Sequence, residues 1–176
     1  MLARTALAVL GSLLLLAGCR SGPTAATSSE PSMVVYNAPP SIFQRDMGND
    51  NRIQGDLIAW HADLAVDLDE SAAGAGRATS AKVVGYCTGT MIVTLDARGG
   101  TDRQHRMTNI ELDWDESPDS LLVAGSHRYK QGQIETDTVI HRAIVGGTGR
   151  YAGAMGEMSS TRLPNGWYRH EIRFVD

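Results

Sequence analysis

The chain has 176 residues, of which 42% are hydrophobic and 20% charged, and its formal net charge is −4. This length suits one ordinary domain, and the composition is that of a globular protein. Acidic and basic residues are scattered, and Lys82 and Lys130 are the only lysines. A nucleic-acid-binding surface needs clustered lysine and arginine, so nucleic acid is not an expected partner.

The N-terminus differs in composition from the rest of the chain. One arginine in MLAR precedes the apolar run TALAVLGSLLLL, which is the layout of a secretory signal and is short for a membrane span. The run ends in Leu16-Ala17-Gly18-Cys19, which resembles the lipobox of bacterial lipoproteins. That resemblance implies a signal peptide over residues 1–18 and lipid attachment at Cys19. An ordinary signal peptide that contains a cysteine is the alternative.

Residues 19–40 are rich in Ser, Thr, Ala, Gly and Pro, which predicts a flexible tether between lipid and domain. Arg20 follows the cysteine, and by resemblance to the sorting rules of Gram-negative lipoproteins it favours the outer membrane, with the domain facing the periplasm. If Cys19 is acylated, Cys87 has no disulfide partner. The fold must then depend on its hydrophobic core.

From residue 41 onward, alternating polarity predicts β-strands. In the stretch over 56–70, one face carries Ile58, Trp60, Ala62, Leu64, Val66 and Leu68, and the other carries His61, Asp63 and Asp67. This period of two indicates one buried and one solvated face. Further strands are expected over 83–96, 106–115, 120–129, 135–145, 155–163 and 167–175. Where the first strand begins, at Met33 or at Ile42, is left open by the pattern.

The turns between these segments are rich in glycine and polar residues, and the Asn165-Gly166 pair is a strong hairpin signal. Seven or eight regularly spaced strands with almost no helix predict a sandwich or a closed barrel.

The glycine-rich stretch from Ala143 to Glu157 has some likeness to a phosphate-binding loop. Such a loop needs a following helix and, in the Walker type, a lysine, and neither is predicted here. We therefore expect a sharp structural corner. Gly146, Gly147 and Gly149 would supply positive φ or close backbone approach, and Tyr151 would cover the corner.

The segment GGTGRYAGAMGE resembles the corner motif of the allene oxide cyclase and dirigent superfamily. Three other segments, GDLIAWHADL, VVGYCTGTMIV and YRHEIRF, occur in the same order as in bacterial members, so the resemblance covers residues 41–176. It implies an all-β, eight-stranded antiparallel closed barrel with an apolar interior, often dimeric or trimeric.

The resemblance weakens at the site of the cyclase reaction. Residues 44–48 are similar to the residues that come after the first-strand segment of plant cyclases, but Ser41, Ile42 and Phe43 stand just before them. The glutamate and water-binding asparagine of those enzymes are not found there. Cys87 matches a cysteine that the cyclases carry, and no catalytic residue is assigned.

The alternation also selects side chains that share a face with the apolar residues. The candidate ligand-binding residues are Trp60, Cys87, His127, Tyr129 and His170. An apolar cavity with a few polar groups is the usual form of a small-molecule site. In the alternative, the two histidines lie near the barrel rims and meet solvent or a backbone carbonyl.

Other sites receive less support. The acidic runs over 67–70 and 113–119 do not follow the EF-hand spacing and are interpreted as solvated turns. No close spacing of His and Cys supports a metal site, and no cofactor is expected.

Three functions remain. The first is a lipid-anchored envelope barrel that binds a small hydrophobic ligand, and it is favoured. The second is an isomerase, a cyclase or a dirigent-like enzyme that acts on a reactive hydrophobic intermediate. The third is a structural or oligomer-forming envelope lipoprotein. A small barrel of eight strands can be filled by side chains or can hold one ligand.

Overall fold

The structure is a computed structural model that describes residues 30–45, 54–71, 80–95, 103–130, 135–136 and 138–175. The predicted signal peptide, the lipid-attachment site Cys19 and the first part of the predicted tether lie outside the described residues. Among the residues it does describe, no helix is long and apolar enough to cross a bilayer.

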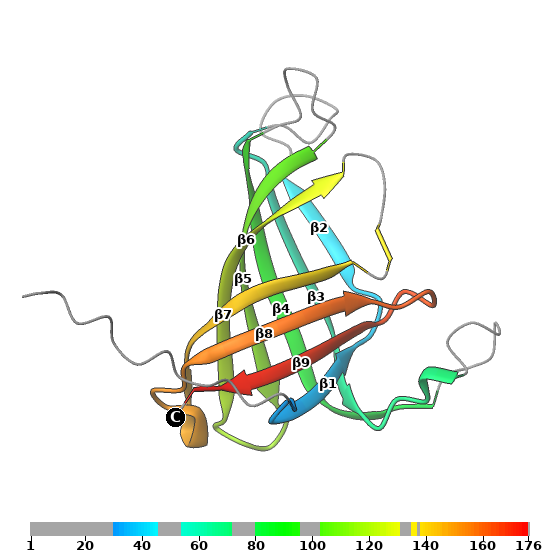
Figure 1. Ribbon diagram of the computed structural model, residues 1–176, viewed down its shortest axis with the longest axis vertical. Coiled ribbons are helices and arrows are strands. Elements are labelled where there is room, and N and C mark those ends of the chain that lie inside the picture. Colours follow the sequence, from blue (N-terminus) through cyan, green and yellow to red (C-terminus); the bar gives the residue numbers. More distant parts are fainter. Residues whose placement is uncertain are drawn as a thin grey trace, which may run out of the picture.

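Nine strands form one continuous antiparallel sheet that closes on itself (Figure 1). They are β1 (Met33–Asn37), β2 (Ser41–Arg45), β3 (Leu57–Val66), β4 (Lys82–Leu95), β5 (Arg103–Trp114), β6 (Ser120–Lys130), β7 (Val139–Thr148), β8 (Gly156–Arg162) and β9 (Tyr168–Phe174). Neighbours in sequence pair from β2 through to β9, and β9 pairs with β1. In Figure 1, β3–β6 form a wall of long strands, and β7–β9 and β1 cross in front of it.

Two short strands, β1 and β2, together occupy one of the eight strand positions around the barrel. β1 and β2 both pair with β3, at Tyr36↔Ala65 and Asn37↔Leu64 for β1 and at five positions from Ser41↔His61 to Arg45↔Leu57 for β2. Pro39 and Pro40 lie between them and cannot donate backbone hydrogen bonds to a ladder. The barrel therefore has eight strand positions, as predicted. The two candidate starts of the first strand, Met33 and Ile42, fall in β1 and β2 respectively.

The position of β1 changes the expected domain boundary. The composition of residues 19–40 predicts a tether, but Met33–Asn37 pairs with β9 along its whole length. Val35 is fully buried. Small and turn-forming residues dominate residues 19–40, so the composition of this segment does not reveal the five-residue strand within it.

The inward faces of the strands follow the predicted alternation. Ile58, Ala62, Leu64, Cys87, Ile110, Leu112, Leu121, Val123, Ile144, Met158 and Ile172 are buried, with Trp60, Val66, Trp114 and Phe174 partly buried. His61, Asp63, Tyr86, Thr88 and Thr90 are exposed on the outside. Burial of the apolar faces is the main stabilising contribution, at about 25 cal/mol for each Å² removed from water.

The glycine corner is architectural. A single turn of 3-10 helix, η2 (Gly149–Tyr151), joins β7 to the loop before β8. Gly146 and Gly149 have φ of +154° and +56°, and a Cβ atom on Gly147 would lie 2.3 Å from the Ser120 carbonyl oxygen. These three positions therefore need glycine, for either backbone conformation or close approach.

The Tyr151 side chain lies among other aromatic rings at this end of the barrel. Its ring lies 5.0 Å from that of Trp114 and 5.9 Å from that of Phe174, measured between centroids. The acid-rich segment before β6 also takes part, because Asp119 accepts a hydrogen bond from the Arg150 backbone and forms an ion pair with its side chain. These contacts lower the pKa of Asp119.

Candidate functional site

The interior of the barrel changes from apolar to polar along its axis. The half next to η2 holds the aliphatic core and the aromatic cap around Tyr151. Toward the other end, inward positions carry Gln104, Arg106, Thr108, His127, Arg142, Ser160, His170 and Asn37, all buried. Buried polar groups need partners, so the hydrogen bonds of this half define the candidate site.

A chain of hydrogen bonds links neighbouring strands, from β6 to β9 and on to β1, through this polar half. Arg142 Nη1 on β7 donates to Ser160 Oγ on β8 over 3.4 Å, and Ser160 Oγ lies 2.8 Å from His170 Nδ1 on β9. His170 Nε2 lies 2.6 Å from Asn37 Oδ1 on β1. In the other direction, Arg142 Nη2 lies 3.3 Å from His127 Nδ1 on β6. We call these five residues, Asn37, His127, Arg142, Ser160 and His170, the polar belt.

The acceptors in the belt fix its protons. Asn37 Nδ2 donates to the Ala38 carbonyl, so its Oδ1 accepts and His170 Nε2 carries a proton. Ser160 Oγ accepts from Arg142 and lies 2.8 Å from His170 Nδ1, which accepts the hydroxyl proton in a neutral ring protonated on Nε2. His127 Nδ1 accepts from Arg142 and from the Thr108 hydroxyl 3.3 Å away. His127 is therefore neutral in the folded protein, and the low pKa that burial gives His170 makes that ring neutral as well.

Burial agrees with this assignment. It lowers the pKa of His170 to about 3, with a further contribution from the positive charge of Arg142. Burial, Arg142 and Arg106 together lower the pKa of His127 to about 3. The expected alternative, in which the histidines meet solvent at the rims, is wrong for both. His170 is 2% and His127 9% exposed.

Arg142 is the centre of the belt. Gly125 on β6 faces the base of the Arg142 side chain, where a Cβ atom would lie 3.1 Å from Arg142 Cγ and 3.3 Å from Arg142 Cβ, so the glycine leaves room for the aliphatic part of Arg142. Arg142 is 8% exposed, and its Nε has no hydrogen-bond partner among the residues that the structure describes. No Asp or Glu within the described part of the chain is in ion-pair distance of it. Burial lowers the pKa of Arg142 to about 10, so it stays charged at neutral pH.

Two tyrosines lie beyond Arg142, on the side away from η2. The Tyr129 and Tyr168 side chains, from β6 and β9, interact through a hydrogen bond, and burial is the largest cause of a raised Tyr168 pKa. Tyr129 also meets the edge of the His127 ring, and the Arg106 guanidinium lies 4.3 Å from its ring centroid. Tyr168 stacks on His170 at 6.4 Å between centroids.

The structure thus brings together four of the five predicted ligand-binding residues. Cys87 joins the belt through a weak contact from Sγ to Asn37 Oδ1 at 3.9 Å, and burial raises its pKa, which keeps it a thiol. Trp60 lies outside the belt, with its ring over Gly89 in the wall between β3 and β4. Whether these residues bind a ligand stays a prediction.

Sequence reasoning missed Asn37, Arg142, Ser160 and Tyr168 as site residues. Arg142 has the parity of Ile144 in VIHRAIV, and Ser160 that of Met158, so the alternation could have placed both inside the barrel. Asn37 could not be assigned, because composition attributes its strand to the tether.

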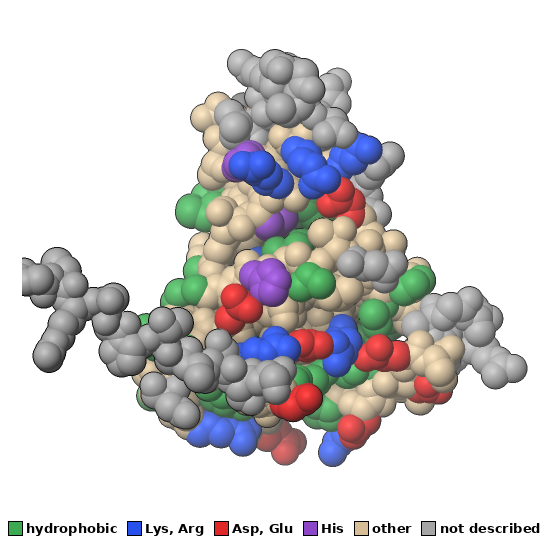
Figure 2. Space-filling view, in the orientation of Figure 1, with side chains coloured by type: hydrophobic (Ala, Val, Ile, Leu, Met, Phe, Trp, Pro, Cys, Tyr) green, Lys and Arg blue, Asp and Glu red, His purple; other side chains and the backbone are tan. Residues whose placement is uncertain are grey.

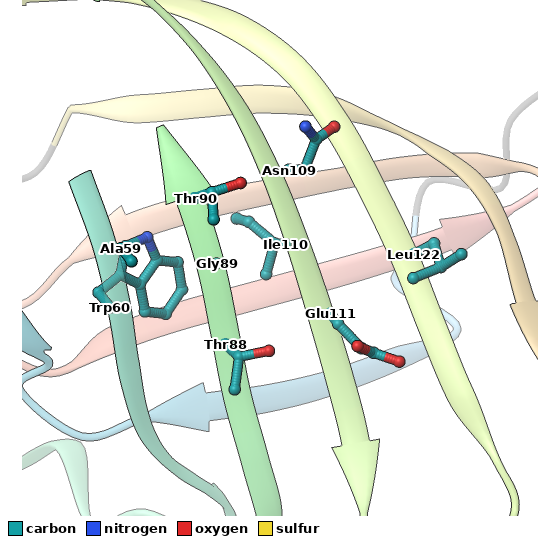
Figure 3. Close-up of a pocket in the computed structure, with 9 residues that line it drawn as sticks. All are labelled: Ala59, Trp60, Thr88, Gly89, Thr90, Asn109, Ile110, Glu111 and Leu122. Atoms are coloured by element: carbon teal, nitrogen blue, oxygen red, sulfur yellow. The ribbon is translucent and has the colours of Figure 1, made fainter. Parts of the chain in front are cut away.

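Two hollows lie on the outer surface. One, of about 410 Å³, lies over β3–β6 and is lined by Ala59, Trp60, Thr88, Gly89, Thr90, Asn109, Ile110, Glu111 and Leu122 (Figure 3). The other, of about 300 Å³, lies beside η2 and is lined in part by Tyr151 and Phe174. Both are open to solvent, and neither contains a residue of the polar belt. In the described ranges, no group of three His, Cys, Asp or Glu side chains could hold a metal ion.

The sequence matches no protein-family model, and a search of curated proteins finds no similar sequence. Solved structures do match. A pyocyanin demethylase superposes with a TM-score of 0.52 and 22% identity, over 79% of this chain and 97% of that one. A pterocarpan synthase dirigent protein superposes with a TM-score of 0.54 and 16% identity, over 85% of this chain and 88% of that one. The chain therefore has the closed eight-stranded antiparallel barrel fold that the dirigent protein shares, as predicted.

Proposed function

We propose that this protein is a lipid-anchored envelope barrel that binds a small hydrophobic molecule in the polar half of its interior. The observation that carries the proposal is the polar belt, which places hydrogen-bonding groups beside two tyrosine rings and next to the apolar half of the interior. Apolar walls with a few converging polar groups are typical of small-molecule sites.

The chemistry of the belt favours binding over catalysis. A general base works best with a pKa near the working pH, but His127 and His170 have pKa values of about 3. His170 also has both ring nitrogens engaged, with Ser160 and Asn37. Cys87 has a raised pKa, and a nucleophile would need the thiolate.

An enzyme is the second candidate. It is favoured by the names of the two similar structures, which give a demethylase and a synthase, and by the His127 Nε2 proton, which the tautomer leaves as a donor. Such a donor could polarise a substrate oxygen without changing its own charge. The third candidate is a purely structural protein. Only the apolar half of the interior, which aliphatic side chains fill, supports it.

Native mass spectrometry of the protein extracted from its own membrane tests the binding proposal. We expect a bound small molecule on the wild type, and loss of that mass in His127→Ala. The matched control is His141→Ala, because His141 lies on the same sheet but is exposed on the outer wall. A wild-type protein without bound mass, or equal occupancy in both variants, would count against the proposal.

The anchor has its own test. Replacing Cys19 with Ala removes the thiol that would receive the diacylglyceryl group, so the protein should move from the membrane to the soluble fraction. The comparison variant is Cys87→Ala, which removes the buried cysteine instead. If the Cys19 variant stays with the membrane, the anchor proposal fails.

A further inference from the structure

We propose that the interior site recognises an organic anion, a carboxylate attached to an apolar or aromatic body, through Arg142. This inference rests on the proposed function and specifies the chemical class of the ligand. It starts from a cation inside the barrel that no carboxylate of the described residues faces.

The surroundings of Arg142 supply no negative charge. Its guanidinium donates to Ser160 and to a neutral histidine, and the groups that interact with it electrostatically are Tyr168, Cys87 and Tyr129. Removing a cation from water is costly unless an anion and hydrogen bonds compensate it. A ligand carboxylate would supply the compensation that the described side chains do not.

The geometry of Arg142 suits a carboxylate. Within the described ranges Nε has no hydrogen-bond partner, and a guanidinium can present Nε–H together with a neighbouring N–H to two carboxylate oxygens. Gly125 and the contacts to Ser160 and His127 hold the side chain in place. The arginine is therefore positioned before any ligand arrives, which reduces the entropy lost on binding.

The remainder of the ligand would meet the tyrosine pair. Tyr129 and Tyr168 lie beside Arg142 on the side away from the aliphatic core, and the Tyr129 ring already accepts the Arg106 guanidinium on its face. Aromatic rings of this kind contact a flat apolar body well and keep a hydroxyl for polar contacts.

The approach to this end of the barrel is also basic. Figure 2 shows Lys and Arg side chains gathered near the end of the molecule where β6 finishes. This end carries Arg103, Arg128 and Lys130, together with the carboxylates of Glu135, which pairs with Arg103, and of Asp56. A positive potential at one end of the molecule attracts anions and speeds their association.

Isothermal titration calorimetry with two matched probes tests the inference on the full-length protein in detergent. The probes are 2-naphthoate, an anion, and its neutral methyl ester. We expect the wild type to bind the naphthoate at least tenfold more tightly than the ester. In Arg142→Met this ratio should fall to about one, while the ester still binds.

Arg142→Met should fold, because an apolar side chain of similar length replaces a buried positive charge that pairs with no described Asp or Glu. We expect its thermal unfolding midpoint to equal or exceed that of the wild type. Lys82→Met is the control, since Lys82 is an exposed cation where β4 begins, at the opposite end of the barrel from Arg103 and Lys130, and it should keep the preference for the anion.

The outcomes separate the two proposals. Equal affinity for both probes in the wild type, or a preference that survives in Arg142→Met, would overturn the anion inference and leave the binding proposal standing. Failure of both probes to bind the wild type would contradict the binding proposal and this inference with it.

Discussion

The apolar half of the barrel interior and its polar half are lined by the same strands but are held together differently. Next to η2, Leu112, Leu121 and Met158 are fully buried among other aliphatic side chains. Toward the other end, Arg142 and the two histidines are held by directed hydrogen bonds. The first half depends on volume and contact, whereas the second depends on matched donors and acceptors.

This difference predicts opposite responses to substitution. A side chain removed from the apolar half leaves a cavity, and the protein loses stability at every pH. The polar half contributes a stability that depends on pH, and replacing its central arginine with an apolar residue removes hydrogen bonds but also removes the cost of burying a charge. A site that binds a ligand is expected in the half that is not optimised for stability.

The largest effect is expected in the apolar half. Leu121→Ala should lower the free energy of unfolding by about 2–5 kcal/mol, because it removes a fully buried side chain. Leu122→Ala, one residue further along β6, changes a side chain that is 40% exposed on the outer wall and should cost about 0.5 kcal/mol. Urea unfolding measures both, and equal losses would contradict the assignment of the two faces.

The polar half should make stability fall in acid. His127 and His170 stay neutral in the fold, with pKa values of about 3, whereas in the unfolded chain they take up protons below 6.5. Their contribution is complete above pH 6.5 and is lost as the pH falls toward 3. Each histidine adds a slope of about 1.4 kcal/mol per pH unit.

Chemical denaturation between pH 6 and pH 4 measures this slope. His170→Asn should reduce it by about 1.4 kcal/mol per pH unit. The exposed His61→Asn variant provides the reference. The same slope in the wild type and in His170→Asn would show that His170 is not neutral in the fold.

A smaller effect is expected at the corner that closes the apolar half. Gly149→Ala places a Cβ atom at φ +56° and 2.0 Å from Asp119 Oδ1, and should cost about 2–3 kcal/mol from backbone strain and a lost hydrogen bond. Gly153→Ala has φ +77° but no atom within 4 Å, and should show the strain of about 1–2 kcal/mol alone. If thermal unfolding gives the same loss for both, the contact with Asp119 is not important.

The smallest effect concerns the outer contacts of β1. Tyr36 donates a 2.6 Å hydrogen bond to Glu70, which also pairs with Arg169 on β9. Tyr36→Phe removes only the hydroxyl and should cost about 0.5–1.5 kcal/mol. Glu70→Gln, measured by the same urea unfolding, should keep part of this hydrogen bond, and a larger loss from it than from Tyr36→Phe would show that the ion pair with Arg169 matters more.

The sequence was sufficient to predict the fold and three of the residues in or beside the polar belt. Alternation assigns His127, Tyr129 and His170 to the interior because each shares a parity with leucine, valine or isoleucine on its own strand. Parity gives the face of a strand but not the height of a residue along the barrel axis. Which inward residues meet therefore depends on strand stagger, so parity alone does not separate Trp60 from the residues around the polar belt.

The belt itself could not be predicted. It joins Asn37 to His170 across 133 positions of the chain, and this contact exists only because β1 closes the barrel against β9. The prolines after β1 mask that strand in the sequence. Arg142 was missed for a different reason, since an arginine in an alternating segment is ordinarily assigned to the solvated face.

The closing contact between β1 and β3 is short, with two paired positions against ten between β3 and β4. Local opening starts where the fewest backbone bonds must break, so amide hydrogens of β1 should exchange with solvent before those of the long wall. This seam contains Asn37, one end of the belt. A ligand that strengthens the polar belt from inside the barrel would therefore also stabilise this seam. Its binding would be measured as slower amide exchange in β1, a strand that the ligand does not contact.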